Sequence, residues 1–173
     1  MNAKLKLFTV AVVAIIWGCM GATDIRTPEK IGEKDRVRLI TGDQAAAIVN
    51  KMHSGEVAGD DNAIGEYGSA KKVVLYITFY KDAKSAQKGF DAMVEKIRAT
   101  KNSPFFHLMP LPKYQNKVYI TLGMGAVHYI YVSGNFLLWL QTDQSFGDQL
   151  PRQLVKLYPV FYDAWPKKKN DFI

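Results

Sequence analysis

Apolar residues recur along this chain with two different periods, and these periods predict its helices and strands. Between residues 83 and 100 they recur every three or four positions, at Ala86, Phe90, Met93, Val94 and Ile97. This spacing is typical of an amphipathic helix whose apolar side faces a core. Similar spacing predicts a first helix over residues 42–53 and a last helix over residues 146–158.

The strands are indicated by a two-residue period in the kind of side chain and by short runs of apolar residues. Six segments have this character: residues 63–67, 71–80, 105–109, 117–122, 126–132 and 136–142. The last four follow one another too closely for the long crossover that a parallel pair needs, so we expect antiparallel pairing. We therefore predict an α+β fold, with a single, mostly antiparallel sheet of five or six strands packed with two or three helices.

The tightest connection between these strands fixes a register. Gly134 and Asn135 both tolerate positive φ and predict a two-residue hairpin turn. Three pairs then lie opposite one another on one face of the sheet: Val132 with Leu137, Ile130 with Trp139, and His128 with Gln141. The alternate residues lie on the other face: Val127, Tyr129, Tyr131, Phe136, Leu138 and Leu140.

The two faces of this hairpin differ in polarity. The face with the two tyrosines is the more apolar, and we expect it to pack against the helices. The other face carries side chains with polar tips, and two interpretations are open: further helix covers it, or it is partly exposed. An exposed apolar patch usually marks a contact site. In that case the candidate binding face consists of His128, Ile130, Trp139 and Gln141.

The N-terminus has the order of a secretory signal. Lys4 and Lys6 precede an uncharged apolar run over residues 7–18, and Cys19, the only cysteine of the chain, follows it. The run is shorter than the about 20 apolar residues that span a bilayer. This pattern predicts export. The cleavage could follow a small residue, Gly18 or Ala22, or the segment could remain as an uncleaved anchor.

The residues around Cys19 resemble the lipobox of bacterial lipoproteins. Ile16, Gly18 and Cys19 stand where that motif has an aliphatic residue, a small residue and the cysteine, while Trp17 is bulkier than the usual residue. The resemblance implies that the Cys19 thiol carries a diacylglyceryl group, that cleavage precedes Cys19, and that a fatty acid such as palmitate acylates the new amine. Met20 follows the cysteine, and this implies the outer membrane, facing the periplasm, if the host has two membranes.

Charge and composition divide the chain into four parts. We expect a signal peptide at 1–18, a lipidated cysteine with a charged tether at 19–38, an α+β domain at 39–160 and an aromatic, basic tail at 161–173. The formal net charge of +7 is moderate, and no nucleic-acid recognition motif is present. We therefore expect a membrane partner through the lipid, and no nucleic acid.

Motifs for catalysis or cofactors are scarce. The three histidines, His53, His107 and His128, do not stand three or four residues from one another, as paired metal ligands on a helix would. No G-x-S-x-G nucleophile motif occurs, and the only thiol belongs to the lipobox. We predict no cofactor and favour a noncatalytic, lipid-anchored envelope protein that binds a partner protein or an apolar ligand. The alternative is a metal-binding protein or enzyme that uses the three histidines.

Overall fold

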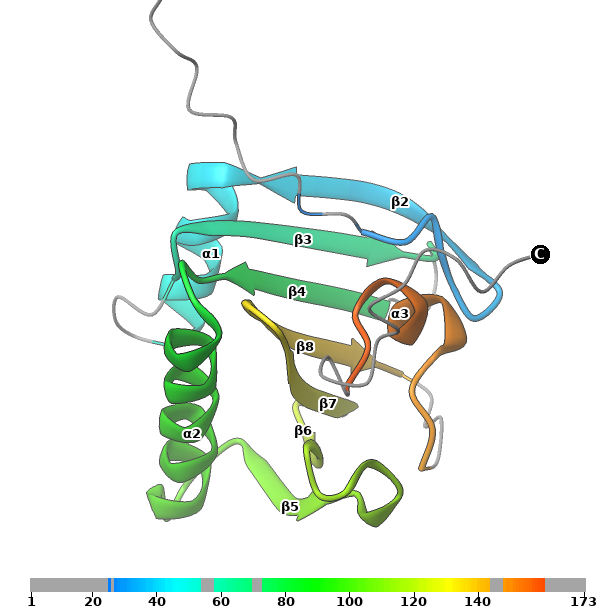
Figure 1. Cartoon of the computed structure of the whole chain (residues 1–173). Coiled ribbons are helices and arrows are strands. Elements are labelled where there is room, and N and C mark those ends of the chain that lie inside the picture. The colour runs from blue at the N-terminus through cyan, green and yellow to red at the C-terminus, as the bar shows by residue number, and fades with distance from the viewer. Residues whose placement is uncertain (1–24, 26, 54–57, 70–72, 144–147, 161–173) are drawn as a thin grey trace, which may run out of the picture.

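In the computed structural model, the described part of the chain forms one curled, antiparallel β-sheet of eight strands (Figure 1). The strands are β1 (Lys30–Ile31), β2 (Lys34–Thr41), β3 (Asp61–Tyr67), β4 (Val73–Phe79), β5 (Phe105–Pro110), β6 (Val118–Gly123), β7 (Ala126–Ser133) and β8 (Phe136–Thr142). In space their order is β1-β2-β3-β4-β8-β7-β6-β5. The structure describes residues 25, 27–53, 58–69, 73–143 and 148–160. The predicted signal peptide, Cys19 and the tail at 161–173 lie outside these residues.

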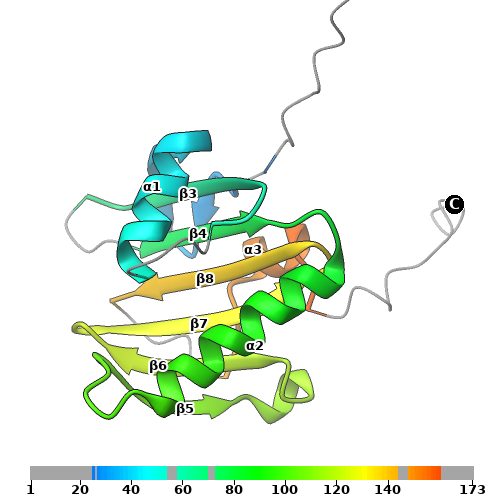
Figure 2. The same ribbon diagram turned by 90° about the vertical axis from the view of Figure 1, so that its left-hand side faces the viewer.

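Helices cover both faces of the sheet. α1 (Gly42–His53) and α2 (Ala83–Ala99) lie on one face, and α3 (Arg152–Leu157) lies on the other (Figures 1 and 2). A short 3₁₀ helix, η1 (Pro112–Tyr114), follows β5. α1 and α2 are confirmed where the apolar spacing predicts them, and α2 begins after Asp82, whose side chain accepts a hydrogen bond of 2.7 Å from the Ser85 N–H. No helix in the described ranges is long and apolar enough to cross a membrane.

The predicted fold class was wrong, because the protein is mostly β and its sheet has eight strands instead of five or six. The two missed strands are β1 and most of β2, which lie in the segment expected to be a tether. β2 alternates charged and apolar residues, and of its side chains only Ile40 is buried. It lies near one edge of the sheet, where charged side chains are common. A low content of apolar residues therefore concealed a strand.

The last helix is also shorter than predicted. We expected residues 146–158, but α3 starts at Arg152, and residues 148–151 are not helical. Pro151 precedes the first helical residue, and its backbone supplies no N–H to a preceding turn. The start of the predicted helix, at residues 146 and 147, lies outside the described residues.

The hairpin register is confirmed, and helices lie on both faces of the hairpin instead of only on the more apolar one. Val132 pairs with Leu137, Ile130 with Trp139, and His128 with Gln141. The two long helices, however, cover the face of Ile130 and Trp139. The more apolar face packs instead into one large cluster with Leu154 of α3 and Ile31 of β1. Because the sheet is curled, side chains from several strands contact one another on that face. The short helix α3 is then enough to complete the core on that side.

Candidate functional site

Two residues of the predicted binding face, Ile130 and Trp139, lie beneath α2. Phe90 and Val94 of this helix pack against Ile130 of β7 and Trp139 of β8. His128 is 1% exposed and Ile130 is fully buried, while Gln141, further along β8, is half-buried. Of the two interpretations that the sequence left open, the described structure therefore shows a helix covering Ile130, while the rings of Phe105 and Trp139 lie against His128 at centroid distances of 5.1 Å and 5.5 Å.

His128 and Trp139 form a buried hydrogen-bonded pair. The indole N–H of Trp139 donates to Nδ1 of His128 over 2.8 Å, and Nε2 of His128 lies 3.0 Å from the carbonyl oxygen of Gly123. Because an indole nitrogen can only donate, Nδ1 must accept, and the imidazole proton sits on Nε2 and is donated to Gly123. Burial lowers the pKa of His128, although the hydrogen bond to Gly123 opposes this shift. His128 is thus held neutral with both ring nitrogens engaged.

Among the described side chains, His107 does not join His128 in a metal site. His107 lies exposed on β5, where the pairing with β6 is irregular and its φ is 55°. His53 is the last residue of α1, and its side chain lies outside the described part. Within the described residues, no three His, Cys, Asp or Glu side chains are grouped as metal ligands. Since both nitrogens of His128 are engaged, the metal or enzyme alternative gains no support from the geometry.

A groove opens beside the covered face, between α1 and α2. Val49 of α1 and Met93 of α2 form its walls, and Thr78 of β4 and Leu137 of β8 form its floor. Its volume is about 440 Å³. Ligand pockets in proteins commonly measure about 300–1,000 Å³ and are mostly apolar, so this groove is large enough for a small molecule.

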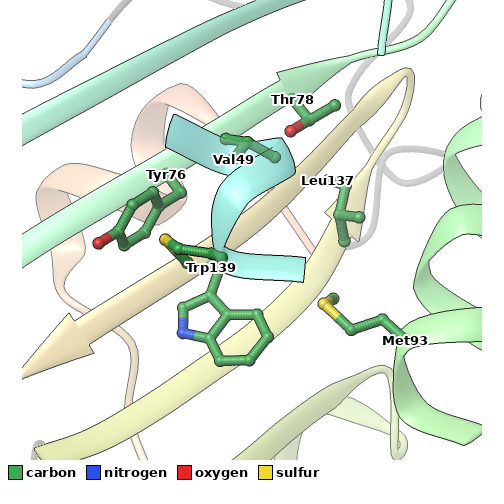
Figure 3. A pocket seen from close by; sticks show the side chains of 7 residues that line it. Val49, Tyr76, Thr78, Met93, Leu137 and Trp139 are labelled. Carbon is green, nitrogen blue, oxygen red and sulfur yellow. The ribbon is translucent and has the colours of Figure 1, made fainter. Parts of the chain in front are cut away.

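A narrow, apolar extension continues this groove along the sheet. It has a volume of about 30 Å³ and shares Val49, Thr78, Met93 and Leu137 with the groove. Its further lining comes from Met52, Tyr76 and Trp139. Figure 3 shows Val49 and Met93 approaching from the two helices over Trp139 and Leu137. Trp139 is therefore the residue of the predicted binding face that reaches this cavity.

The groove exists because α2 carries two different stripes. One stripe, with Phe90 and Val94, packs onto the sheet. The other lines the groove and consists of Ser85, Lys88, Gly89, Ala92, Met93 and Lys96. Small residues at its centre leave the space open. A Cβ at Gly89 would stand 2.7 Å from the Tyr80 hydroxyl oxygen, so a larger residue there would displace the Tyr80 side chain.

Sequence reasoning missed this second stripe, although a signal for it was present. A glycine inside a helix costs about 1 kcal/mol relative to alanine, so it usually has a packing reason. Gly89 and Ala92 stand between Lys88 and Lys96, beside the strongly apolar stripe. That combination indicates a side of the helix that lines a cavity, instead of facing bulk solvent or packing into the core.

The chemistry of the groove suits binding and offers little for catalysis. Among the described lining residues there is no histidine, cysteine or carboxylate. The Thr78 hydroxyl donates to the Asn62 side-chain oxygen over 3.0 Å, so its proton is already used. Burial, and after it the negative charge of Asp60, raises the pKa of the Tyr80 phenol, which stays protonated at neutral pH.

Comparison of the chain with protein-family models, with curated proteins and with solved structures found no match. The function must therefore be inferred from the geometry of the groove and from the N-terminal sequence.

The buried state of His128 predicts a pH-dependent stability. The pKa of His128 is lowered on folding, so the unfolded chain, with a histidine pKa of about 6.5, binds the proton more readily than the folded one. The free energy of unfolding should therefore fall as the pH drops below about 6.5, and the loss should level off below the folded pKa. Urea unfolding at pH 7.5 and 5.5 measures this. A His128→Gln variant should show a smaller decrease, and an equal decrease in both proteins would contradict the assignment.

Proposed function

We propose that this protein is a noncatalytic, lipid-anchored envelope protein that binds an apolar ligand in the groove between α1 and α2. The observation that carries the proposal is the groove itself. It has a volume of about 440 Å³, apolar walls from Val49 and Met93, and a narrow extension that ends at Trp139. A mostly apolar site of this size is typical of the pockets in which proteins bind small molecules.

The floor of the groove favours an apolar molecule over an extended peptide. β4 is paired with β3 and β8, and β8 is paired with β4 and β7, so both floor strands lie inside the sheet. An extended peptide usually binds by adding its backbone hydrogen bonds to a free strand edge. The floor presents no such edge, whereas an apolar molecule needs none.

The N-terminal sequence supports the placement in the envelope. Cys19 and the apolar run before it resemble a lipobox, which implies acyl chains on the protein and an outer-membrane location facing the periplasm in a host with two membranes. Burial of each CH₂ group is worth about 0.8 kcal/mol, so two or three chains would hold the protein firmly on a bilayer.

The lipid anchor is tested by metabolic labelling. Cells that express the full chain should incorporate an alkyne analogue of palmitic acid into it, because acylation is expected at Cys19. The Cys19→Ala variant should carry no label and should leave the membrane fraction. Label on the variant, or a wild-type chain that never carries label, would remove the anchor from the proposal.

Ligand binding is tested with N-phenyl-1-naphthylamine, an uncharged probe whose fluorescence rises in an apolar site. The purified full chain in phosphatidylcholine nanodiscs should increase this signal above that of empty nanodiscs. Ala92 is exposed and lines the groove, so Ala92→Phe should fill the space and weaken probe binding at least about fivefold, which corresponds to about 1 kcal/mol.

Ala99→Phe is the matched control, since Ala99 is an exposed residue at the end of the same helix and does not line the groove. This variant should bind the probe as the wild type does. If neither the wild type nor the control binds the probe, or if Ala92→Phe binds it equally well, the groove is not the binding site.

A further inference from the structure

We propose that His128 is a pH-sensitive switch that weakens ligand binding in the groove when it is protonated, and that Trp139 connects the two. This inference rests on the proposed function, because it concerns the regulation of the same groove. It depends on three features of the described residues: the hydrogen bonds of the imidazole, the uncharged side chains around it and the position of the indole at the groove.

Two hydrogen bonds hold His128 in one neutral form. Its Nδ1 accepts the indole N–H of Trp139 over 2.8 Å, and its Nε2 donates to the carbonyl oxygen of Gly123 over 3.0 Å. The ring of Phe105 stands edge-on to the imidazole at a centroid distance of 5.1 Å. Because His128 is 1% exposed, its ring nitrogens depend on these protein partners instead of bulk water.

A second proton on the imidazole is incompatible with this arrangement. It would bind at Nδ1, where the Trp139 indole already presents a proton and can act only as a donor. Two donors cannot share a hydrogen bond, so the indole would have to leave Nδ1. The bond from Nε2 to Gly123 would remain, since that nitrogen keeps its proton. Protonation of His128 therefore acts on Trp139.

The strands beside His128 present uncharged side chains to it. These are Thr121 of β6 and Gln141 of β8, which pair with it in the register, and Phe105 of β5. Burial lowers the pKa of His128, and the hydrogen bond to Gly123 is the cause that opposes this shift. The imidazole is therefore neutral at pH 7.5 and takes up a proton only in acid, below its ordinary pKa of about 6.5.

Charged and titratable side chains on the surrounding elements interact with other groups. Arg98 of α2 donates to the Tyr119 hydroxyl over 3.4 Å and lies over that ring. Burial, and after it the charge of Glu66, raises the pKa of Tyr76 on β4, so this phenol stays neutral. Glu66 itself forms an ion pair of 3.6 Å with Arg38 on β2. None of these interactions supplies a counter-ion to the imidazole.

Trp139 connects the imidazole to the ligand site. Its indole lines the small extension of the groove, where Val49 and Met93 approach it from the two helices (Figure 3). An indole displaced from Nδ1 would shift into this space, because Phe90 and Val94 of α2 pack on it elsewhere. The shift would narrow the site, so acid should weaken the binding of an apolar ligand. By the same coupling, a bound ligand should oppose protonation.

The test is the affinity for N-phenyl-1-naphthylamine between pH 7.5 and 4.5, with the full chain in phosphatidylcholine nanodiscs. The wild type should bind the probe about twofold to tenfold more weakly in acid, which is the effect expected from the loss of one hydrogen bond. The change should follow a single transition with a midpoint below about pH 6.5.

Two histidine variants locate the group that is responsible. His128→Gln should bind the probe with the same affinity across this pH range, because an amide takes up no proton. His107→Gln is the matched control, since His107 is an exposed histidine of β5 outside the groove lining. This control should keep the pH dependence of the wild type.

An NMR measurement on the wild type tests the switch even if His128→Gln does not fold. In spectra of the chain labelled with ¹⁵N at tryptophan, the indole signal of Trp139, assigned with Trp139→Phe, should shift with the same midpoint as the affinity. Saturation with the probe should move this midpoint to lower pH. An indole signal that does not respond to acid would contradict the switch.

The outcomes separate this inference from the proposed function. Affinity that is independent of pH, or an equal pH dependence in the wild type and His128→Gln, would overturn the switch while leaving an apolar groove. Failure of the probe to bind at pH 7.5 would overturn the proposed function. Acid weakening that disappears only in His128→Gln would support both.

Discussion

The packing of α2 against β7 and β8 determines which part of this face of the sheet is buried and which part remains open as the groove. Phe90 and Val94 meet Ile130 and Trp139 there, and burial of one such side chain is worth about 1.5–3 kcal/mol. Trp139 in turn contacts His128, and burial of that imidazole lowers its pKa. α1 packs on β2 and β3, while α2 packs on β7 and β8 (Figure 2). The groove lies between the two helices, with Thr78 of β4 and Leu137 of β8 in its lining.

Local patterns in the sequence were sufficient for the elements that depend on local physics. The apolar spacing of α2 and the turn at Gly134 are short-range features, and they were predicted correctly together with the register of β7 and β8. β1 and β2 were missed because an edge strand keeps its charged side chains in solvent and buries few residues. Ile31, 1% exposed, shows that this segment belongs to the core, but a lone isoleucine among charges gives no periodic signal.

The candidate site was predictable only in part, because it depends on contacts between segments far apart in the sequence. The register placed Trp139 and Ile130 on one face, and that placement was correct. Which face the long helices cover depends on the curl of the whole sheet, and no single strand encodes it. The lysines at 88 and 96 looked like an ordinary solvent-exposed side of a helix, since the facing residue Val49 comes from a different helix.

The central claim is that a ligand enters between α1 and α2, and the methionines of this chain test it most directly. Met93 and Met52 line the groove and its extension, whereas Met109 and Met124 are exposed elsewhere, with 54% and 75% of their surface accessible. NMR spectra of the full chain labelled with ¹³C at the methionine methyl groups, recorded during a titration with N-phenyl-1-naphthylamine, report on both sets at once. The account predicts saturable shifts of the Met93 and Met52 methyl signals and unchanged signals from Met109 and Met124. Shifts confined to Met109 and Met124, or no shift at Met93, would contradict it.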